Sequence, residues 1–211
     1  MLMLPQKKES KIIYDEELYF TTSSATFVTA FSQTVKGAAK FQLSHEVSDI
    51  YWELTIDGVM IVNDQIAVDN ATYGVSGVWE IEWKRSVLIR IREAGGTDDA
   101  FIIGSWTNRG DIGRIYDKPF TFSTTSATLV TALELAGRGS IQFQVLNEAL
   151  TTTNMQVTID GKVIIADRQI IGTTLGGVSG VWRFDWRRSI KIELREGGAS
   201  NAIAHGFYWL R

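Results

Sequence analysis

The chain has 211 residues, of which 45% are hydrophobic and 21% charged, and its formal net charge is −3. This composition excludes a disordered or collagen-like chain, and the small negative charge gives no general attraction to nucleic acid. The chain has no cysteine, which excludes disulfide frameworks, thiolate nucleophiles and iron–sulfur clusters, and its two histidines exclude a histidine-rich metal site.

Residues 1–10 stand apart from the rest of the chain. Four apolar residues, Met1, Leu2, Met3 and Leu4, precede Pro5 and a polar stretch. A signal peptide has its positive charge first and then about 7–15 apolar residues, and a membrane helix needs about 20. We therefore expect no signal peptide and no membrane segment. Residues 1–10 are either a frayed end or an arm that docks on a neighbouring subunit.

The remaining chain contains an internal repeat. Residues 24–30 (SATFVTA) recur as 126–132 (SATLVTA), and residues 75–79 (VSGVW) recur unchanged as 178–182. The offset is 102 residues in the first pair and 103 in the second, so the repeats differ by a one-residue insertion between these segments. We expect such insertions to lie in loops. We therefore predict an N-terminal arm over residues 1–10 and two domains. Repeat 1 covers residues 11–109, and repeat 2 covers residues 113–211.

Each repeat has the pattern of an antiparallel β domain. Short apolar and polar alternations rich in β-branched and aromatic residues recur, and no stretch keeps a helical period. Asp57-Gly58 and Asp160-Gly161 separate apolar strands and suit the positive φ angles of a type I′ hairpin turn. The predicted fold class is all-β, with two tandem antiparallel β-sandwich modules of jelly-roll-like form. A small closed barrel is the competing architecture.

Residues 78–92 predict a hairpin in repeat 1 with its tip at 84–86. Trp79 and Trp83 then lie on one apolar face, and Glu80 lies opposite Arg90 on the other face. The same alignment in repeat 2 places Arg183 opposite Glu193. Opposite charges directly across two strands are stabilising, so the pattern favours this register with the tryptophans in the core.

Few residues suggest catalytic or metal chemistry. His45 and His205 are not conserved between the repeats and are best explained as strand-surface or edge residues. Asp64 and Asp167 are repeated acids, so they are candidates for a general acid or a calcium ligand, although a turn-forming role is the stronger interpretation. We expect no enzyme activity, no metal and no cofactor.

The aromatic residues supply the interface candidates. Trp52 and Trp209 are not repeated, since Met155 and Thr107 take their places, and Trp106 is matched by a tyrosine. Large aromatic residues without a core pattern are typical of contact surfaces. The predicted interface residues are therefore Met1, Leu2, Met3, Leu4, Trp52, Trp106 and Trp209. A sugar-stacking platform is the alternative role for the tryptophans.

Charge is divided unevenly between the repeats. Repeat 1 has 8 Lys/Arg and 14 Asp/Glu, net −6, and repeat 2 has 11 and 8, net +3. The repeats either contact different partners or allow copies of the chain to meet acidic end to basic end. The alternative is that the charge difference arose by neutral drift on solvent-exposed surfaces and has no function.

Two segments of repeat 2 carry a family resemblance. The segment 157–165 (VTIDGKVII), followed by 187–194 (RRSIKIEL), resembles small β-sandwich modules of tailed-phage virion proteins, found in capsid decoration proteins, head fibres and tail appendages. The resemblance implies a structural or adhesive role, assembly on a virion and no enzyme activity.

These observations predict a non-enzymatic phage virion protein, with capsid decoration or appendage subunit as the leading function. Its expected partners are other virion proteins or copies of itself, with no nucleic acid and no membrane. We expect it in the virion, after synthesis in the host cytoplasm. The alternative is a tandem carbohydrate-binding module that binds a cell-surface glycan through exposed aromatic residues.

Overall fold

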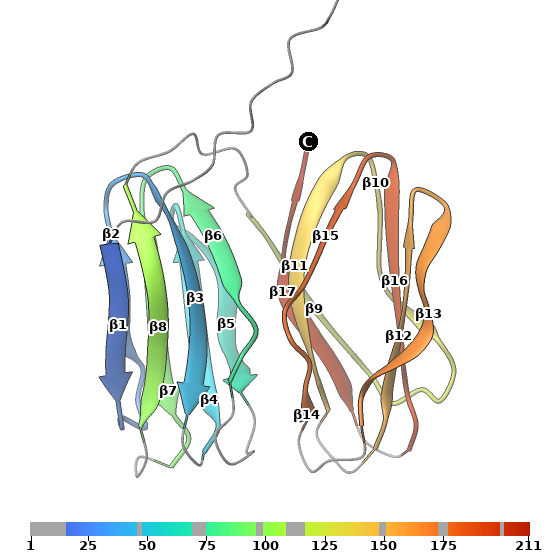
Figure 1. The fold of residues 1–211 in the computed structure, drawn as a ribbon, viewed down its shortest axis with the longest axis horizontal. Coiled ribbons are helices and arrows are strands. Elements are labelled where there is room, and N and C mark those ends of the chain that lie inside the picture. Colours follow the sequence, from blue (N-terminus) through green and yellow to red (C-terminus); the bar gives the residue numbers. More distant parts are fainter. Residues whose placement is uncertain are drawn as a thin grey trace, which may run out of the picture.

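A computed structural model describes residues 16–45, 48–68, 75–95, 99–108, 117–147, 151–172, 177–198 and 201–211. Every regular element in these ranges is a β-strand, and the strands form two modules side by side (Figure 1). The all-β prediction is therefore confirmed. The predicted limits at residues 1, 10, 11, 109 and 113 lie outside the described residues.

The first module contains eight strands in two sheets. One four-stranded sheet has the order β1-β8-β3-β6 and the other has the order β2-β7-β4-β5. Neighbouring strands are antiparallel throughout. The strands are β1 (Glu16–Thr22), β2 (Val28–Gln33), β3 (Gly37–His45), β4 (Ile50–Ile56), β5 (Val59–Val68), β6 (Trp79–Trp83), β7 (Val87–Glu93) and β8 (Ala100–Thr107).

The second module repeats this order. One sheet runs β14-β11-β17-β9, with β15 also paired to β11, and the other runs β10-β16-β12-β13. The strands are β9 (Lys118–Thr124), β10 (Val130–Ala136), β11 (Gly139–Asn147), β12 (Thr153–Ile159), β13 (Lys162–Ile171), β14 (Gly177–Val178), β15 (Trp182–Trp186), β16 (Ser189–Glu196) and β17 (Ala202–Leu210).

This strand order is that of a jelly roll. Numbered within a module, strands 1, 8, 3 and 6 form one sheet and strands 2, 7, 4 and 5 form the other, so successive strands mostly change sheets. Two packed sheets of eight antiparallel strands in this arrangement define the jelly-roll form of the β-sandwich. The predicted tandem sandwich modules are confirmed, and the competing closed barrel is wrong.

The inner faces of the sheets supply the cores. Trp79 and Trp83 on β6 are fully buried, as is Trp52 on β4, and they pack with Phe41 and the aliphatic residues of repeat 1. Trp186 occupies the corresponding core of repeat 2. The prediction that the repeated tryptophans point inward is confirmed for these residues, whereas Trp182 is only half-buried.

The predicted hairpin over 78–92 is wrong. Strand β6 pairs with β3, and β7 pairs with β2 and β4 in the opposite sheet, so residues 84–86 connect the two sheets. Both strands turn an apolar side to the same core, which produces the alternation that a hairpin would also show. Arg90 contacts Glu53 and not Glu80.

The charge pairing proposed for repeat 2 is wrong for the same reason. Strand β15 pairs with β11, whereas β16 pairs with β10 and β12. Glu193 accepts hydrogen bonds from Lys191 at 2.7 Å and from Gln156 at 3.0 Å. Arg183 forms an ion pair with Glu80 of repeat 1.

The two Asp-Gly turns are confirmed. Ile56 pairs directly with Val59, and the intervening Asp57 and Gly58 have φ angles of 52° and 86°. The Asp57 carboxylate also accepts hydrogen bonds from the backbone N–H groups of 84–86, at 2.6 Å from Arg85. Burial is the largest influence on the Asp57 pKa and raises it, but these backbone donors together hold the pKa below its ordinary value. Asp57 therefore fixes the connection between the two sheets.

We expect Asp57→Ala to lower the free energy of unfolding by about 1–2 kcal/mol, because three backbone donors lose their acceptor and alanine tolerates positive φ less well than aspartate does. Asp57→Asn is the matched control, since asparagine tolerates positive φ and keeps one acceptor oxygen. Urea denaturation should rank wild type above the Asn variant and the Asn variant above the Ala variant. Equal midpoints for all three proteins would show that this side chain does not stabilise the connection.

Candidate functional site: the contact between the repeats

The two repeats meet along one edge of the first sandwich. The outer face of the sheet containing β9, β17 and β11 lies beside strands β5 and β6 of repeat 1 (Figure 1). Strand β5 is an edge strand of one sheet of repeat 1, and β6 is an edge strand of the other. Repeat 2 therefore covers the open side of the first sandwich with the flat face of one of its own sheets.

Phe207 on β17 makes the central apolar contact. Its side chain is fully buried and belongs to the core of repeat 1, although the residue lies in repeat 2. The rings of Phe207 and Trp79 are 5.3 Å apart between centroids, and Val181 and Trp209 pack beside the same core. Phe207 points outward from its own sheet, so an outer-face residue of one module completes the interior of the other.

Polar groups at the contact are matched across it. The Glu80 N–H donates to Gln142 Oε1 at 3.0 Å, and Gln142 Nε2 donates to the Glu80 carbonyl at 2.5 Å. The Glu80 carboxylate pairs with Arg183 and with Lys40. Burial raises the Glu80 pKa most strongly, but the two cations together bring that pKa below its ordinary value. Hydrogen bonds and ion pairs thus fix the orientation that the apolar contact allows.

Gly77 permits the closest approach of the repeats. A Cβ atom at Gly77 would lie 2.0 Å from the Val181 backbone nitrogen and 2.8 Å from its side chain. No larger residue fits without moving the repeats apart, because backbone atoms cannot yield as a flexible side chain can.

Both histidines are buried, which corrects their assignment as surface or edge residues. His45 lies on β3 and His205 on β17, each between two neighbouring strands. His205 lies at the contact between the repeats, where its ring stacks on Trp79 with centroids 6.3 Å apart. Burial lowers the His205 pKa to about 4, so the ring is neutral near pH 7.

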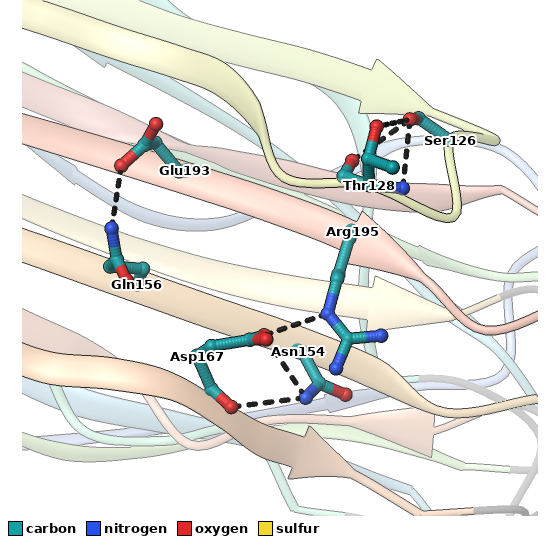
Figure 2. Close-up of polar contacts among 7 residues, drawn as sticks. All are labelled: Ser126, Thr128, Asn154, Gln156, Asp167, Glu193 and Arg195. Atoms are coloured by element: carbon teal, nitrogen blue, oxygen red, sulfur yellow. Dashed lines mark hydrogen bonds and ion pairs between the residues drawn. The ribbon is translucent and has the colours of Figure 1, made fainter.

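The repeated acids Asp64 and Asp167 lie at irregular points of β5 and β13, where both have positive φ. Arg195 donates to Asp167 at 2.7 Å, and Asn154 donates to the same carboxylate at 3.2 Å (Figure 2). The Arg195 hydrogen bond is the main reason that the Asp167 pKa is below its ordinary value. A general acid needs a raised pKa, so this environment disfavours that role for Asp167. Arg92 pairs in the same way with Asp64 at 2.9 Å.

Within the described ranges, no three His, Cys, Asp or Glu side chains come together as a metal-binding group. The same ranges contain no helix with the length and apolarity needed to cross a membrane.

The structure places the predicted interface tryptophans differently from one another. Trp52 is fully buried in the core of repeat 1, so its assignment to a surface is corrected. Trp106 is half-buried and packs against Phe31 at 5.5 Å between ring centroids. Trp209 is half-buried at the contact between the repeats. Met1, Leu2, Met3 and Leu4 lie outside the described residues.

Two surface clefts flank the contact. One of about 380 Å³ lies between β5 and the strands β9 and β17, and it includes Asn63, Gln65 and Thr121. The other, of about 480 Å³, is lined by Ile56, Asp57, Val59, Lys84, Arg85, Asp117, Trp209 and Leu210. The second cleft combines an aromatic ring with charged groups of both signs.

Sequence reasoning missed two buried acids. Glu93 and Glu196 occupy equivalent strand ends, and both are fully buried. The Glu93 carboxylate accepts hydrogen bonds from the Gly95 N–H at 2.8 Å and from Ser48, and Glu196 accepts one from the Gly198 N–H at 2.9 Å. Both glutamates recur at equivalent positions shortly before a glycine, and this repetition could have identified them in the sequence. Their role is to close the turn that follows each strand.

Comparisons with known proteins yield structural similarities only. No protein-family model and no curated protein matches the chain. Similar solved structures include the STIV MCP (9% identity, TM-score 0.45, covering 96% of this chain and 95% of that chain). They also include the major capsid protein P2 from bacteriophage PM2 (8% identity, TM-score 0.45, covering 92% of this chain and 97% of that chain). A third is the PBSX exported protein XepA (9% identity, TM-score 0.28, covering 92% of this chain and 85% of that chain). These distant similarities assign the chain no family and no function.

We expect Gly77→Ala to destabilise the protein by about 1–3 kcal/mol, because the added methyl group collides with the Val181 backbone. Gly180→Ala is the matched control, since Gly180 is the equivalent glycine of repeat 2 and a Cβ there has no neighbour within 4 Å. Its effect on the free energy of unfolding should stay within about 0.5 kcal/mol. Equal destabilisation by the two variants, measured by urea denaturation, would contradict the described packing of the repeats.

We expect His205 to make stability depend on pH between about 4 and 6.5. In this window the unfolded chain binds a proton at His205 and the native protein does not, so the free energy of unfolding falls as the pH falls. The loss amounts to about 3 kcal/mol at most. Chemical denaturation at several pH values should show a shallower dependence for His205→Phe than for wild type. Parallel curves for the two proteins would show that His205 is not held neutral at this contact.

Proposed function

We propose that this chain is a non-enzymatic structural protein of a phage virion, a capsid decoration or appendage subunit that acts through protein–protein contacts. The observation that carries the proposal is an exposed apolar patch on a rigid sheet. Tyr19 on β1 and Ile103 on β8 are directly opposite each other on the outer face of the first sheet, and both are exposed. Grouped exposed apolar side chains on a soluble protein mark a contact surface.

The architecture supports this role. Jelly rolls occur in viral capsid domains and in lectin domains. Here two of them share core residues and a matched set of hydrogen bonds, so they offer a preformed surface to a partner. A fold does not determine a function, so the proposal rests on the exposed patch formed by Tyr19 and Ile103.

Two further features fit assembly on a particle. Repeat 1 has a net charge of −6 and repeat 2 of +3, so the two modules present different electrostatic surfaces to their partners. The apolar residues Met1 to Leu4 supply a second anchor in this proposal, in which the arm and one repeat hold the lattice and the other repeat faces outward.

A carbohydrate-binding protein is the second candidate, because of the cleft that contains Trp209. An aromatic ring stacks on the apolar face of a sugar, and carboxylates such as Asp57 and Asp117 accept hydrogen bonds from its hydroxyl groups. Trp106 is half-buried as well, and its ring packs against Phe31.

Mass spectrometry of gradient-purified virions from a lysate of the host that carries this gene tests the proposal. We expect the chain to co-purify with particles in many copies and to be absent from a matched gradient of uninfected cells. A chain found only in the soluble fraction would refute the virion role. Saturable quenching of tryptophan fluorescence by a glycan selected on an array, abolished by Trp209→Ala, would then favour the carbohydrate-binding candidate.

A further inference from the structure

Duplication gives the chain two copies of each surface used at the contact between its repeats. We define the docking face as the outer face of the sheet that contains β9, β17 and β11, with His205, Phe207 and Val181. We define the receiving edge as strands β5 and β6, with Ile61, Trp79 and the preceding Gly77. Repeat 2 uses its docking face and repeat 1 uses its receiving edge. Ile164, Trp182 and Gly180 are the repeat 2 equivalents of the receiving-edge residues, and Ile103, Ser105 and Val78 are the repeat 1 equivalents of the docking-face residues.

The unused receiving edge of repeat 2 is apolar and open. Ile164 on β13 is 52% exposed, whereas its equivalent Ile61 is 3% exposed. Trp182 is half-buried, whereas its equivalent Trp79 is fully buried beneath Phe207. Gly180 has no atom within 4 Å of an added Cβ, although its equivalent Gly77 lies against Val181. Among the described residues, each of these positions in repeat 2 is more open than its equivalent in repeat 1.

The unused docking face of repeat 1 is apolar and open as well. Ile103 on β8 is 51% exposed, and its equivalent His205 is 1% exposed. Val78 is also exposed, whereas its equivalent Val181 packs against the core of the other repeat. Tyr19, which pairs with Ile103, extends the same surface. Apolar side chains thus occupy outward positions that are exposed in the described part of the chain but correspond to a buried contact in the other repeat.

We propose that the docking face of repeat 1 binds the receiving edge of repeat 2 in a second copy of this chain, in the orientation of the contact within one chain. This inference rests on the proposed assembly function and names its partner. The contact joins different surfaces of the two copies, so it is head-to-tail and continues from copy to copy. Each added chain buries one docking face and one receiving edge and exposes one of each.

Charge favours this pairing over a symmetric one. Outward side chains on the first sheet include Glu17 and Glu82, and exposed side chains of β13 include Lys162 and Arg168. When the docking face of repeat 1 binds the receiving edge of repeat 2, the acidic repeat of one copy (net −6) lies against the basic repeat of the next copy (net +3). Two docking faces placed together would instead join two acidic surfaces, which costs free energy.

The contact between copies is weaker than the contact within one chain. Ser105 stands at the position of Phe207 in the repeat alignment, so the docking face of repeat 1 lacks the ring that fills the core of its neighbour. Two separate chains also lose translational and rotational freedom when they associate, a cost that the contact within one chain does not have. The assembly should therefore be reversible and depend on protein concentration.

Two variants, each blocking one surface, test the proposal. Ile103→Glu places a charge on the docking face, and Ile164→Glu places one on the receiving edge. Val35→Glu is the matched control, because Val35 is equally exposed (50%) and lies on neither surface. Circular dichroism and thermal unfolding establish that each variant is folded.

Sedimentation velocity and light scattering supply the measurement. At about 100 μM, wild type and the Val35 variant should form species larger than the 23.5 kDa chain, and each blocked variant should remain a monomer. An equimolar mixture of the two blocked variants should form a dimer and nothing larger, because one intact docking face meets one intact receiving edge. No symmetric contact predicts that result.

Three outcomes would overturn the inference: a wild-type monomer at this concentration, blocked variants that still assemble, or a mixture that stays monomeric. Failure here is distinguishable from failure of the proposed function. A chain that co-purifies with virions but never self-associates retains the virion role and loses this partner. A chain that self-associates but is absent from virions retains this contact and loses the virion role.

Discussion

The burial of Phe207 from repeat 2 in the core of repeat 1 is the contact on which the rest of the structure depends. Burying one such ring contributes about 2–3 kcal/mol, and its removal would expose Trp79 at the open side of the first sandwich. Repeat 1 is therefore not complete within its own strands. The hydrogen bonds between Gln142 and Glu80, and the close approach at Gly77, are possible only because this contact holds the two sheets at that distance.

Duplication followed by divergence explains features that look unrelated in the sequence. Glu80 and Arg183 are equivalent positions with opposite charge, and the structure brings them together across the contact. His205 and Phe207 replace Ile103 and Ser105 where the outer face of repeat 2 became an interior surface. One copy of each surface was thus adapted to the contact within the chain, and the proposed self-association uses the other copy.

The sequence was sufficient to predict the duplication, the all-β class, the Asp-Gly turns and the inward-facing Trp79. It did not predict which strands are neighbours, because alternation reports the side that faces a core and not the sheet that holds the strand. Residues 78–92 fit a hairpin for this reason, and their matching charges were a coincidence. The contact between the repeats was also missed, since an outward Phe207 has the same pattern as a surface residue. Comparing it with Ser105 in the alignment of repeats was the available signal.

Labelling the tryptophans with 5-fluorotryptophan and following their ¹⁹F resonances through urea denaturation tests this account most directly. If Phe207 completes the first core, the resonances of Trp79 in repeat 1 and Trp186 in repeat 2 should disappear in one shared transition. Phe207→Ala should shift the folded Trp79 resonance and leave that of Trp186 in place. Two separate transitions, with a Trp79 resonance that does not respond to the Phe207 variant, would show that the repeats fold independently and contradict the account.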